Sequence, residues 1–145
     1  MTDLQSMLIA QEGTGPMKDG RYYPYPDRVD KLTIGHGRNL DDHGLSEMEV
    51  SMLFSNDIAD AIGDARLACG SFDTLSRPRQ LVLCSMAFNL GRHRLTGFVK
   101  FLSAIGRQDW DTAAAEILNS EAATEAVDRY RTLAAMMKNN SSVWV

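Results

Sequence analysis

The chain has 145 residues, 44% of them hydrophobic and 23% charged, enough for one domain with a substantial core and unlike a disordered composition. Its formal net charge of −4 argues against general nucleic-acid binding, because such binding depends on neutralising phosphates. The apolar run Met7–Ala10 is too short for a signal peptide or a membrane span, and two cysteines form no disulfide framework, so we expect a cytoplasmically made protein with reduced cysteines.

Charge is distributed unevenly along the chain. Residues 1–76 hold 6 Lys/Arg and 13 Asp/Glu, a net charge of −7, whereas residues 77–145 hold 9 and 6, a net charge of +3. A basic half opposite an acidic half favours an anionic polymer on one side of a cleft. The alternative is that each half is an ordinary solvated surface, and the sequence supports both interpretations equally.

The first predicted element is a short helix over residues 3–12, where apolar residues recur with helical spacing. Asp3 is the candidate N-cap, and a Gly-Pro pair at residues 15–16 prevents the helix from continuing. Glu12 is therefore expected at the helix C-terminus, where the helix dipole disfavours a negative charge. A Glu at such a position is usually an ordinary surface residue, but it also suits a general acid.

Residues 17–40 contain glycines and prolines that exclude a long helix. Residues 21–23 and 31–34 have the composition of strands, and Asp27 lies in the turn between them. We expect a small antiparallel hairpin or a three-stranded sheet with long turns. Thr33 lies in the second strand-like run, just before a Gly-X-Gly turn.

A long helix is predicted over residues 47–69. Ser46 and Glu49 match the capping box S-x-x-E, and an apolar period typical of a helix follows them. A helix of this length is long enough to bridge two lobes of a protein.

The rest of the chain is predicted to be helical. A helix that begins at Ser76 is apolar on nearly all sides, so we expect it to be buried at the centre and to end at Gly91. Three more helices are expected, near residues 96–106, 109–119 and 122–138. Asp109 caps the second of these, and Trp144 is a candidate to dock against the helices. The expected fold class is α+β and predominantly helical, in a single domain.

Three residues together have the chemistry needed to cleave a glycosidic bond. Glu12 can donate a proton, Asp27 can act as the second carboxylate, and the hydroxyl of Thr33 can orient a water molecule. Each alone is a weak signal, because Asp is common in turns and Thr is common in strands. In this order and spacing, they resemble the Glu…Asp…Thr constellation of the tailed-phage lysozymes, the endolysins of glycoside hydrolase family 24. Other segments also resemble this family, namely residues 87–91, 96–98, 109–114 and 129–131.

The resemblance covers nearly the whole chain and implies a lysozyme-like fold. Such a fold would have a small β-containing lobe at about residues 13–45 and a bridging helix at about residues 47–69. Its helical lobe would comprise about residues 70–145 together with the N-terminal helix 3–12. This arrangement agrees with the elements expected from the sequence pattern itself.

The resemblance also implies an activity and a set of catalytic residues. By this resemblance, Glu12 is the general acid, Asp27 the base or stabilising carboxylate, and Thr33 the hydroxyl that positions water. The implied reaction is hydrolysis of the β-1,4 bond between N-acetylmuramic acid and N-acetylglucosamine in bacterial peptidoglycan. No cofactor takes part in it.

Further residues are implied to bind the substrate. Asn89 matches a polar residue that lines the family's cleft. An Arg of the late helix usually pairs with the catalytic Glu, and we favour Arg129, with Arg131 as the alternative. His36 lies close to Thr33 in sequence and is a candidate to line the cleft, although a turn or packing role is the alternative.

The chain departs from the family between Glu12 and Asp27. This segment is several residues longer than in the best-known members, and we interpret residues 15–20 as an inserted loop near the mouth of the cleft. The longer segment makes Asp19 and Asp30 alternatives to Asp27 as the second carboxylate. The spacing to the threonine of the motif favours Asp27.

A second departure is Arg38, which stands where the family often has a His. An ion pair made by that His would then be absent or rebuilt. The three histidines and two cysteines lack the spacing of a metal site, so we expect no metal and no cofactor.

Other functions stay open at this point. A lytic transglycosylase needs mainly the acid and expels water, whereas Asp27 and Thr33 favour hydrolysis. A catalytically silent lysozyme-like module would bind glycan or serve as a structural part, and a helical DNA-binding domain is disfavoured by the charge. We expect a monomer that contacts peptidoglycan strands, binds no nucleic acid, spans no membrane and reaches the cell wall through a phage-encoded pore.

Overall fold

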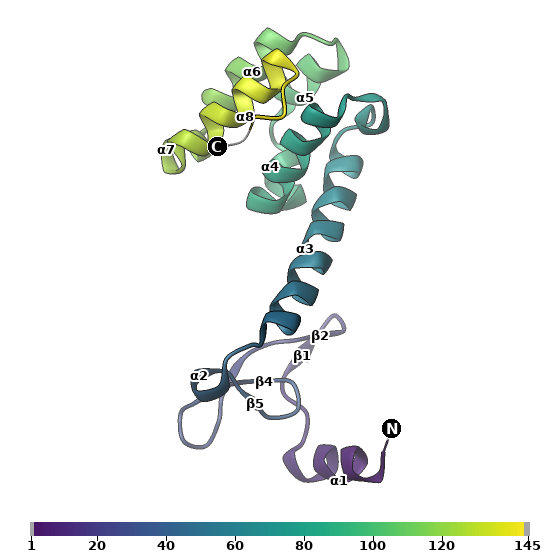
Figure 1. Ribbon diagram of the computed structural model, residues 1–145, viewed down its shortest axis with the longest axis vertical. Coiled ribbons are helices and arrows are strands. Elements are labelled where there is room, and N and C mark those ends of the chain that lie inside the picture. Colours follow the sequence, from purple (N-terminus) through teal and green to yellow (C-terminus); the bar gives the residue numbers. More distant parts are fainter. Residues whose placement is uncertain (1, 144–145) are drawn as a thin grey trace. The chain divides into compact units, whose positions relative to one another are not determined.

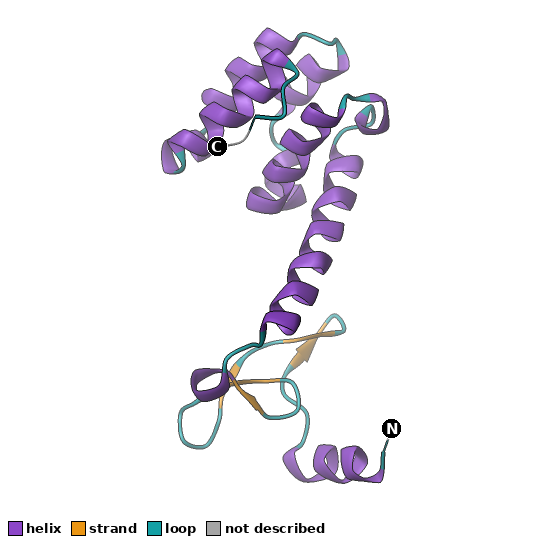
Figure 2. Cartoon of the chain, viewed as in Figure 1, coloured by secondary structure: helices purple, strands orange, loops and turns teal. Residues whose placement is uncertain are grey.

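The computed structural model describes residues 2–143, so Met1, Val145 and the expected docking of Trp144 lie outside the described residues. The chain divides into two units, residues 1–52 and residues 53–145. Helices predominate in the chain as a whole (Figure 1), and Figure 2 shows that the strands are few and short. The expected fold class, α+β and mostly helical, is confirmed.

The first unit holds all the strands of the described chain. Its elements are α1 (Asp3–Glu12), β1 (Met17–Lys18), β2 (Arg21–Tyr22), β3 (Tyr25–Pro26), β4 (Leu32–Ile34), β5 (Arg38–Asn39), α2 (Leu40–His43) and the start of α3 (Glu47–Ala68). The second unit continues α3 and is otherwise built from helices. Its further elements are η1 (Phe72–Thr74), α4 (Arg77–Thr96), α5 (Val99–Gly106), α6 (Trp110–Leu118), α7 (Glu121–Glu125) and α8 (Val127–Asn139).

Helix α1 ends where the sequence predicts but begins with a different cap. The Thr2 hydroxyl accepts a hydrogen bond from the Gln5 backbone N–H at 3.2 Å, and the Gln5 side chain accepts one from the Thr2 N–H at 2.8 Å. This reciprocal capping box makes Thr2 the N-cap, so the assignment of Asp3 was wrong. Asp3 lies in the first turn instead, where its negative charge interacts favourably with the helix dipole.

The strands form two sheets, which corrects the expected pairing. Strand β2 pairs with β1, so residues 21–22 do not form a hairpin with residues 32–34. The reason is local: Asp19 and Gly20 both have positive φ, 51° and 75°, as in the type I′ turns that close two-residue hairpins. Residues 15–20, interpreted as an inserted loop, thus contribute β1 and its turn. The three-stranded alternative does exist, in the order β3-β4-β5.

Helix α3 begins at the predicted capping box. The Glu49 carboxylate accepts hydrogen bonds from the Ser46 N–H and hydroxyl, both at 2.7 Å. Arg38 also contacts the same carboxylate oxygen at 3.1 Å and donates to the Gly44 carbonyl. The bonds from Ser46, with the charge of Arg38, lower the pKa of Glu49. Arg38 and Glu49 thus form an ion pair at the start of α3.

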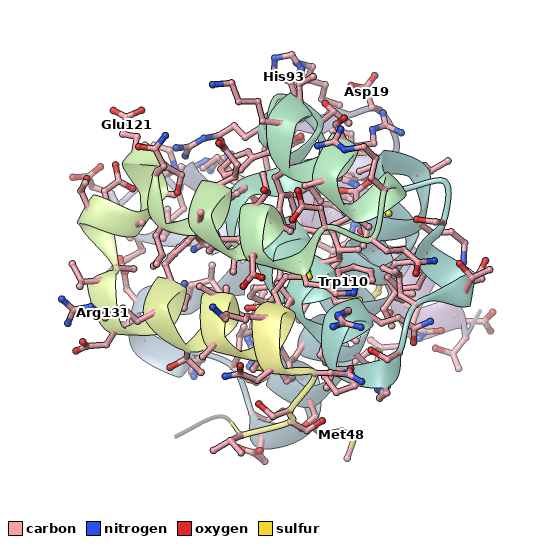
Figure 3. All side chains as sticks on the ribbon, turned by 90° about the horizontal axis from the view of Figure 1, so that it is seen from above. Asp19, Met48, His93, Trp110, Glu121 and Arg131 are labelled. Atoms are coloured by element: carbon pink, nitrogen blue, oxygen red, sulfur yellow. The ribbon has the colours of Figure 1, made fainter. Side chains whose placement is uncertain are left out.

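The second unit has a continuous apolar core. Helix α4 buries five residues, Val82, Leu83, Met86, Ala87 and Leu95, and α6 lies against α8 (Figure 1). Figure 3 shows Trp110 among the side chains of this unit, with Arg131 at its edge, and the Arg79 guanidinium lies 3.7 Å from the centre of the Trp110 ring. The helix expected at residues 122–138 is broken at Ala126, whose φ of −139° and ψ of 62° separate α7 from α8.

Helix α3 has 22 residues, yet acidic side chains recur along it. Among residues 2–143, no helix is both long enough and apolar enough to cross a membrane.

Cys69 and Cys84 are both free thiols, and burial raises the pKa of Cys84.

Gly91 interrupts α4 with a φ of 72° and a ψ of 163°, a region of backbone space that glycine alone adopts readily. The predicted end of the helix is thus a kink, after which helical residues continue to Thr96. We expect Gly91→Ala to lower the free energy of unfolding by about 1–3 kcal/mol. Urea denaturation followed by circular dichroism measures this difference.

The matched control is Gly63→Ala within α3. No heavy atom lies within 4 Å of a Cβ added at Gly63, and the residue is helical, so this change should stabilise the protein by about 0.5–1 kcal/mol. The two substitutions add the same methyl group but are expected to have opposite signs. A Gly91→Ala protein as stable as the wild type would contradict the assigned backbone constraint.

Candidate active site

Glu12 is the last residue of α1 and is held next to the turn that follows β4. The chain leaves α1 through Gly13, and Gly15 then donates a backbone hydrogen bond to the Gly35 carbonyl at 2.8 Å. A Cβ added at Gly37 would lie 3.9 Å from the Cβ of Glu12. The backbone tether at Gly15 therefore brings the exposed carboxyl-bearing residue against residues 35–37.

Gly15 also packs tightly against a tyrosine of β3. A Cβ added at Gly15 would lie 2.6 Å from a ring carbon of Tyr25 and 2.9 Å from the Gly35 carbonyl oxygen. Real Cβ atoms do not approach backbone this closely, so only glycine is tolerated here. The ring of Tyr25 is thus fixed between the α1–β1 connection and β4, where Tyr25 pairs with Thr33.

Asp27 begins the turn from β3 to β4 and organises it. Its Oδ1 accepts hydrogen bonds from the backbone N–H groups of Val29 and Lys31, both at 2.9 Å. Its own N–H donates to the Lys31 carbonyl at 2.9 Å. Within residues 2–143, Oδ2 accepts no hydrogen bond, so one oxygen builds the turn and the other is available to a ligand.

Thr33 is the central residue of β4 and is only 3% exposed. Its hydroxyl donates a hydrogen bond to the Lys31 carbonyl at 3.1 Å. The donor of this hydroxyl is therefore occupied, while its oxygen keeps lone pairs that can accept a hydrogen bond. A water molecule bound by Thr33 would donate a hydrogen bond to the Thr33 oxygen and keep its own lone pairs free.

Acidic residues of helix α2 hold the start of β4 in place. The Asp41 carboxylate accepts a hydrogen bond from the Leu32 N–H at 2.9 Å, and Asp42 forms an ion pair with Lys31 at 2.8 Å. The hydrogen bond and charge of this pair raise the pKa of Lys31 and lower that of Asp42. The strand that carries Thr33 is therefore anchored by acids of α2.

Glu12, Asp27 and Thr33 line one hollow, as the sequence motif predicts. Its volume is about 680 Å³, within the range of about 300–1,000 Å³ that small-molecule sites occupy. The hollow is lined by residues from α1, from β3 and its turn, and from β4 and its turn. These residues are Gln11, Glu12, Tyr25, Pro26, Asp27, Arg28, Thr33 and Gly37.

Sequence reasoning missed Tyr25 and Arg28, which lie two residues before Asp27 and directly after it. Tyr25 contributes an aromatic ring and Arg28 a guanidinium, so the hollow holds a cation as well as two carboxyl groups. The sequence signal that points to Arg28 is its position directly after the candidate carboxylate. Nothing local distinguishes Tyr25 from Tyr22 or Tyr23, because its role depends on pairing with Thr33.

The three expected binding residues lie in different places. His36 is an exposed residue between Gly35 and Gly37, and its Nε2 lies 3.3 Å from the Tyr22 hydroxyl. Asn89 and Arg129 belong to the second unit. Asn89 accepts a hydrogen bond from the buried Tyr130 at 3.1 Å, and Arg129 is exposed. The expected contacts of these two residues with glycan or Glu12 stay predictions.

The alternative to Arg129 was Arg131, which lies 3.6 Å from Asp128 in a weak pair on the surface of α8. Within residues 2–143, no group of three His, Cys, Asp or Glu side chains is arranged to hold a metal ion.

No protein-family model matches the chain, and no curated protein matches it. A functional interpretation therefore depends on the geometry of the hollow and on the sequence motif.

Proposed function

We propose that this protein is a glycoside hydrolase of the muramidase type, which cleaves the β-1,4 bond between N-acetylmuramic acid and N-acetylglucosamine in peptidoglycan. The observation that carries the proposal is the hollow shared by Glu12, Asp27 and Thr33. These residues come from a helix end, a turn and a strand, and a proton donor, a second carboxylate and a hydroxyl are the groups this hydrolysis needs.

In the proposed mechanism, Glu12 donates its proton to the glycosidic oxygen as the bond to the anomeric carbon breaks. Positive charge then develops on the sugar ring, and the free oxygen of Asp27 stabilises it or accepts a proton from the attacking water. The water donates a hydrogen bond to the Thr33 oxygen. The hydroxyl of Thr33 itself already donates a hydrogen bond to the Lys31 carbonyl. After the water has added, Glu12 and Asp27 return to their starting states by exchanging protons with solvent.

The expected partner is a peptidoglycan glycan strand, with no cofactor, no metal and no nucleic acid. We propose that the protein acts as a monomer, on the cell wall, after release from the host cytoplasm through a phage-encoded pore. The lysozyme-like lobes expected from the family resemblance are part of the same proposal, with the difference that α1, expected with the helical lobe, belongs to the first unit together with the strands.

Product analysis tests the proposal directly. We expect the purified protein to clear isolated cell walls and to release muropeptides with reducing N-acetylmuramic acid ends, because water attacks the sugar. Mass spectrometry before and after borohydride reduction identifies these ends. Release of 1,6-anhydro ends, each lighter by one water, would instead show a lytic transglycosylase and would contradict the hydrolytic role given to Asp27 and Thr33.

A further inference from the structure

The segment that lengthens the chain between Glu12 and Asp27 is an ordered hairpin. Strands β1 and β2 pair in the register Met17 with Tyr22 and Lys18 with Arg21. Directly opposed residues of an antiparallel pair point to the same face, so Met17 and Tyr22 share one face and the two basic residues share the other. The hairpin therefore has an apolar, aromatic face and a basic face.

The apolar face is attached to the turn that borders the candidate active site. The Tyr22 hydroxyl lies 3.3 Å from His36 Nε2, and the two rings contact edge to face with centroids 5.5 Å apart. The base of the hairpin is closed by the bond from the Tyr23 N–H to the Pro16 carbonyl and tied to the turn by the bond from Gly15 to Gly35. His36 is the chain neighbour of Gly37, which lines the hollow, so the aromatic face is joined to the lining of the hollow through these two residues.

This face is open to solvent, although it is ordered. Tyr22 is 39% exposed and Met17 is 52% exposed, so neither ring nor thioether is used to fill a core. A sugar ring presents an apolar face of C–H groups, and a rigid tyrosine offers a large matching surface with few torsions to restrict. A polysaccharide bound in the hollow extends beyond it, and the face of Tyr22 and Met17 is a surface joined to its lining through His36 and Gly37.

We propose that Tyr22, held in position by His36, binds a sugar ring of the glycan strand next to the ring that is cleaved. This inference rests on the proposed function, because it assigns a second part of the same substrate. Tyr22 supplies the surface for the sugar, His36 orients the tyrosine ring, and Met17 extends the apolar face. His36 is then a positioning residue, which is close to the packing role that the sequence left as the alternative, and it is not among the residues that line the hollow.

The test uses soluble glycan strands from which the peptides have been removed by an amidase. We expect Tyr22→Ala to raise KM about three- to tenfold, with a smaller change in kcat, because the lost surface binds substrate and transition state alike. Tyr22→Phe keeps the ring and should stay within about twofold of the wild type. Tyr23→Ala is the matched control, since it removes a similarly exposed tyrosine ring one residue away, 46% exposed against 39% for Tyr22.

Titration of the same strands into the Glu12→Gln protein measures binding without cleavage and should show the same loss on adding Tyr22→Ala. If Tyr22→Ala does not fold, Tyr22→Leu compared with Tyr22→Phe decides, because leucine keeps bulk without an aromatic face. An unchanged KM in a folded Tyr22→Ala or Tyr22→Leu enzyme that still cleaves overturns the inference alone. A wild-type protein that neither binds nor cleaves the strands overturns the proposed function and this inference together.

Discussion

Replacing Glu12 with glutamine should lower the rate of cell-wall hydrolysis about 10²–10⁴-fold, the usual contribution of a general acid. Glutamine has the shape of glutamate but cannot donate a proton to the leaving oxygen. Glu12 is exposed and has no hydrogen-bond partner among residues 2–143, so the free energy of unfolding should change by no more than about 0.5 kcal/mol. Turbidity loss of isolated cell walls and release of muropeptides measure the rate.

The control is Glu125→Gln, which removes an exposed carboxylate from the end of α7 and should leave the rate unchanged. Equal clearing by wild type and the Glu12→Gln variant would show that Glu12 is not the acid. If the wild type itself releases no muropeptide but binds cell walls, the chain is a silent glycan-binding module. In that case the hollow is a binding site without chemistry.

Helix boundaries were predictable where the signal is local. The Ser46 and Glu49 pair lies three residues apart and caps α3 as expected, and Asp109 accepts the predicted bond from the Thr112 N–H at 3.1 Å. The cap of α1 was misassigned because Thr2 and Asp3 are both good caps, and only the Gln5 side chain decides between them. Such reciprocal bonds depend on residue types at fixed spacing, which the sequence displays.

Strand pairing was less predictable, because it depends on turns. The Asp19-Gly20 dipeptide is a strong signal for a two-residue hairpin. This signal alone predicts that the strands on either side of it, β1 and β2, pair with each other and not with the larger sheet. The break at Ala126 has no comparable signal, since alanine favours helices and only its observed backbone angles show the interruption.

That Glu12, Asp27 and Thr33 lie together was predictable from their order and spacing, and the three residues do line one hollow, while their catalytic roles stay a proposal. The remaining lining was not predictable, because Tyr25 reaches it through pairing across the sheet. The exposed aromatic face at Tyr22 likewise depends on the hairpin register. Spacing along the chain thus identifies candidate chemistry, while the residues that surround it follow from long-range contacts.

Two single replacements of Asp27 should distinguish its structural role in the turn from its chemical role in the reaction. Asp27→Asn keeps a carbonyl oxygen that can accept from the Val29 and Lys31 N–H groups, so we expect a normal fold with hydrolysis lowered about 10²–10⁴-fold. Asp27→Ala loses both bonds and should also lower the free energy of unfolding by about 1–3 kcal/mol. Urea denaturation and muropeptide release, measured on both variants, give the two effects.

The other two acids considered for this role provide matched controls. Asp19 and Asp30 have positive φ, 51° and 64°, and asparagine adopts this conformation readily, so Asp19→Asn and Asp30→Asn should fold normally. Neither residue lines the hollow, and both variants should keep wild-type rates. If Asp30→Asn were inactive and Asp27→Asn active, Asp27 would be only a turn former. Its two bonds through Oδ1 would then account for its whole contribution, and the carboxylate of the reaction would have to come from Asp30.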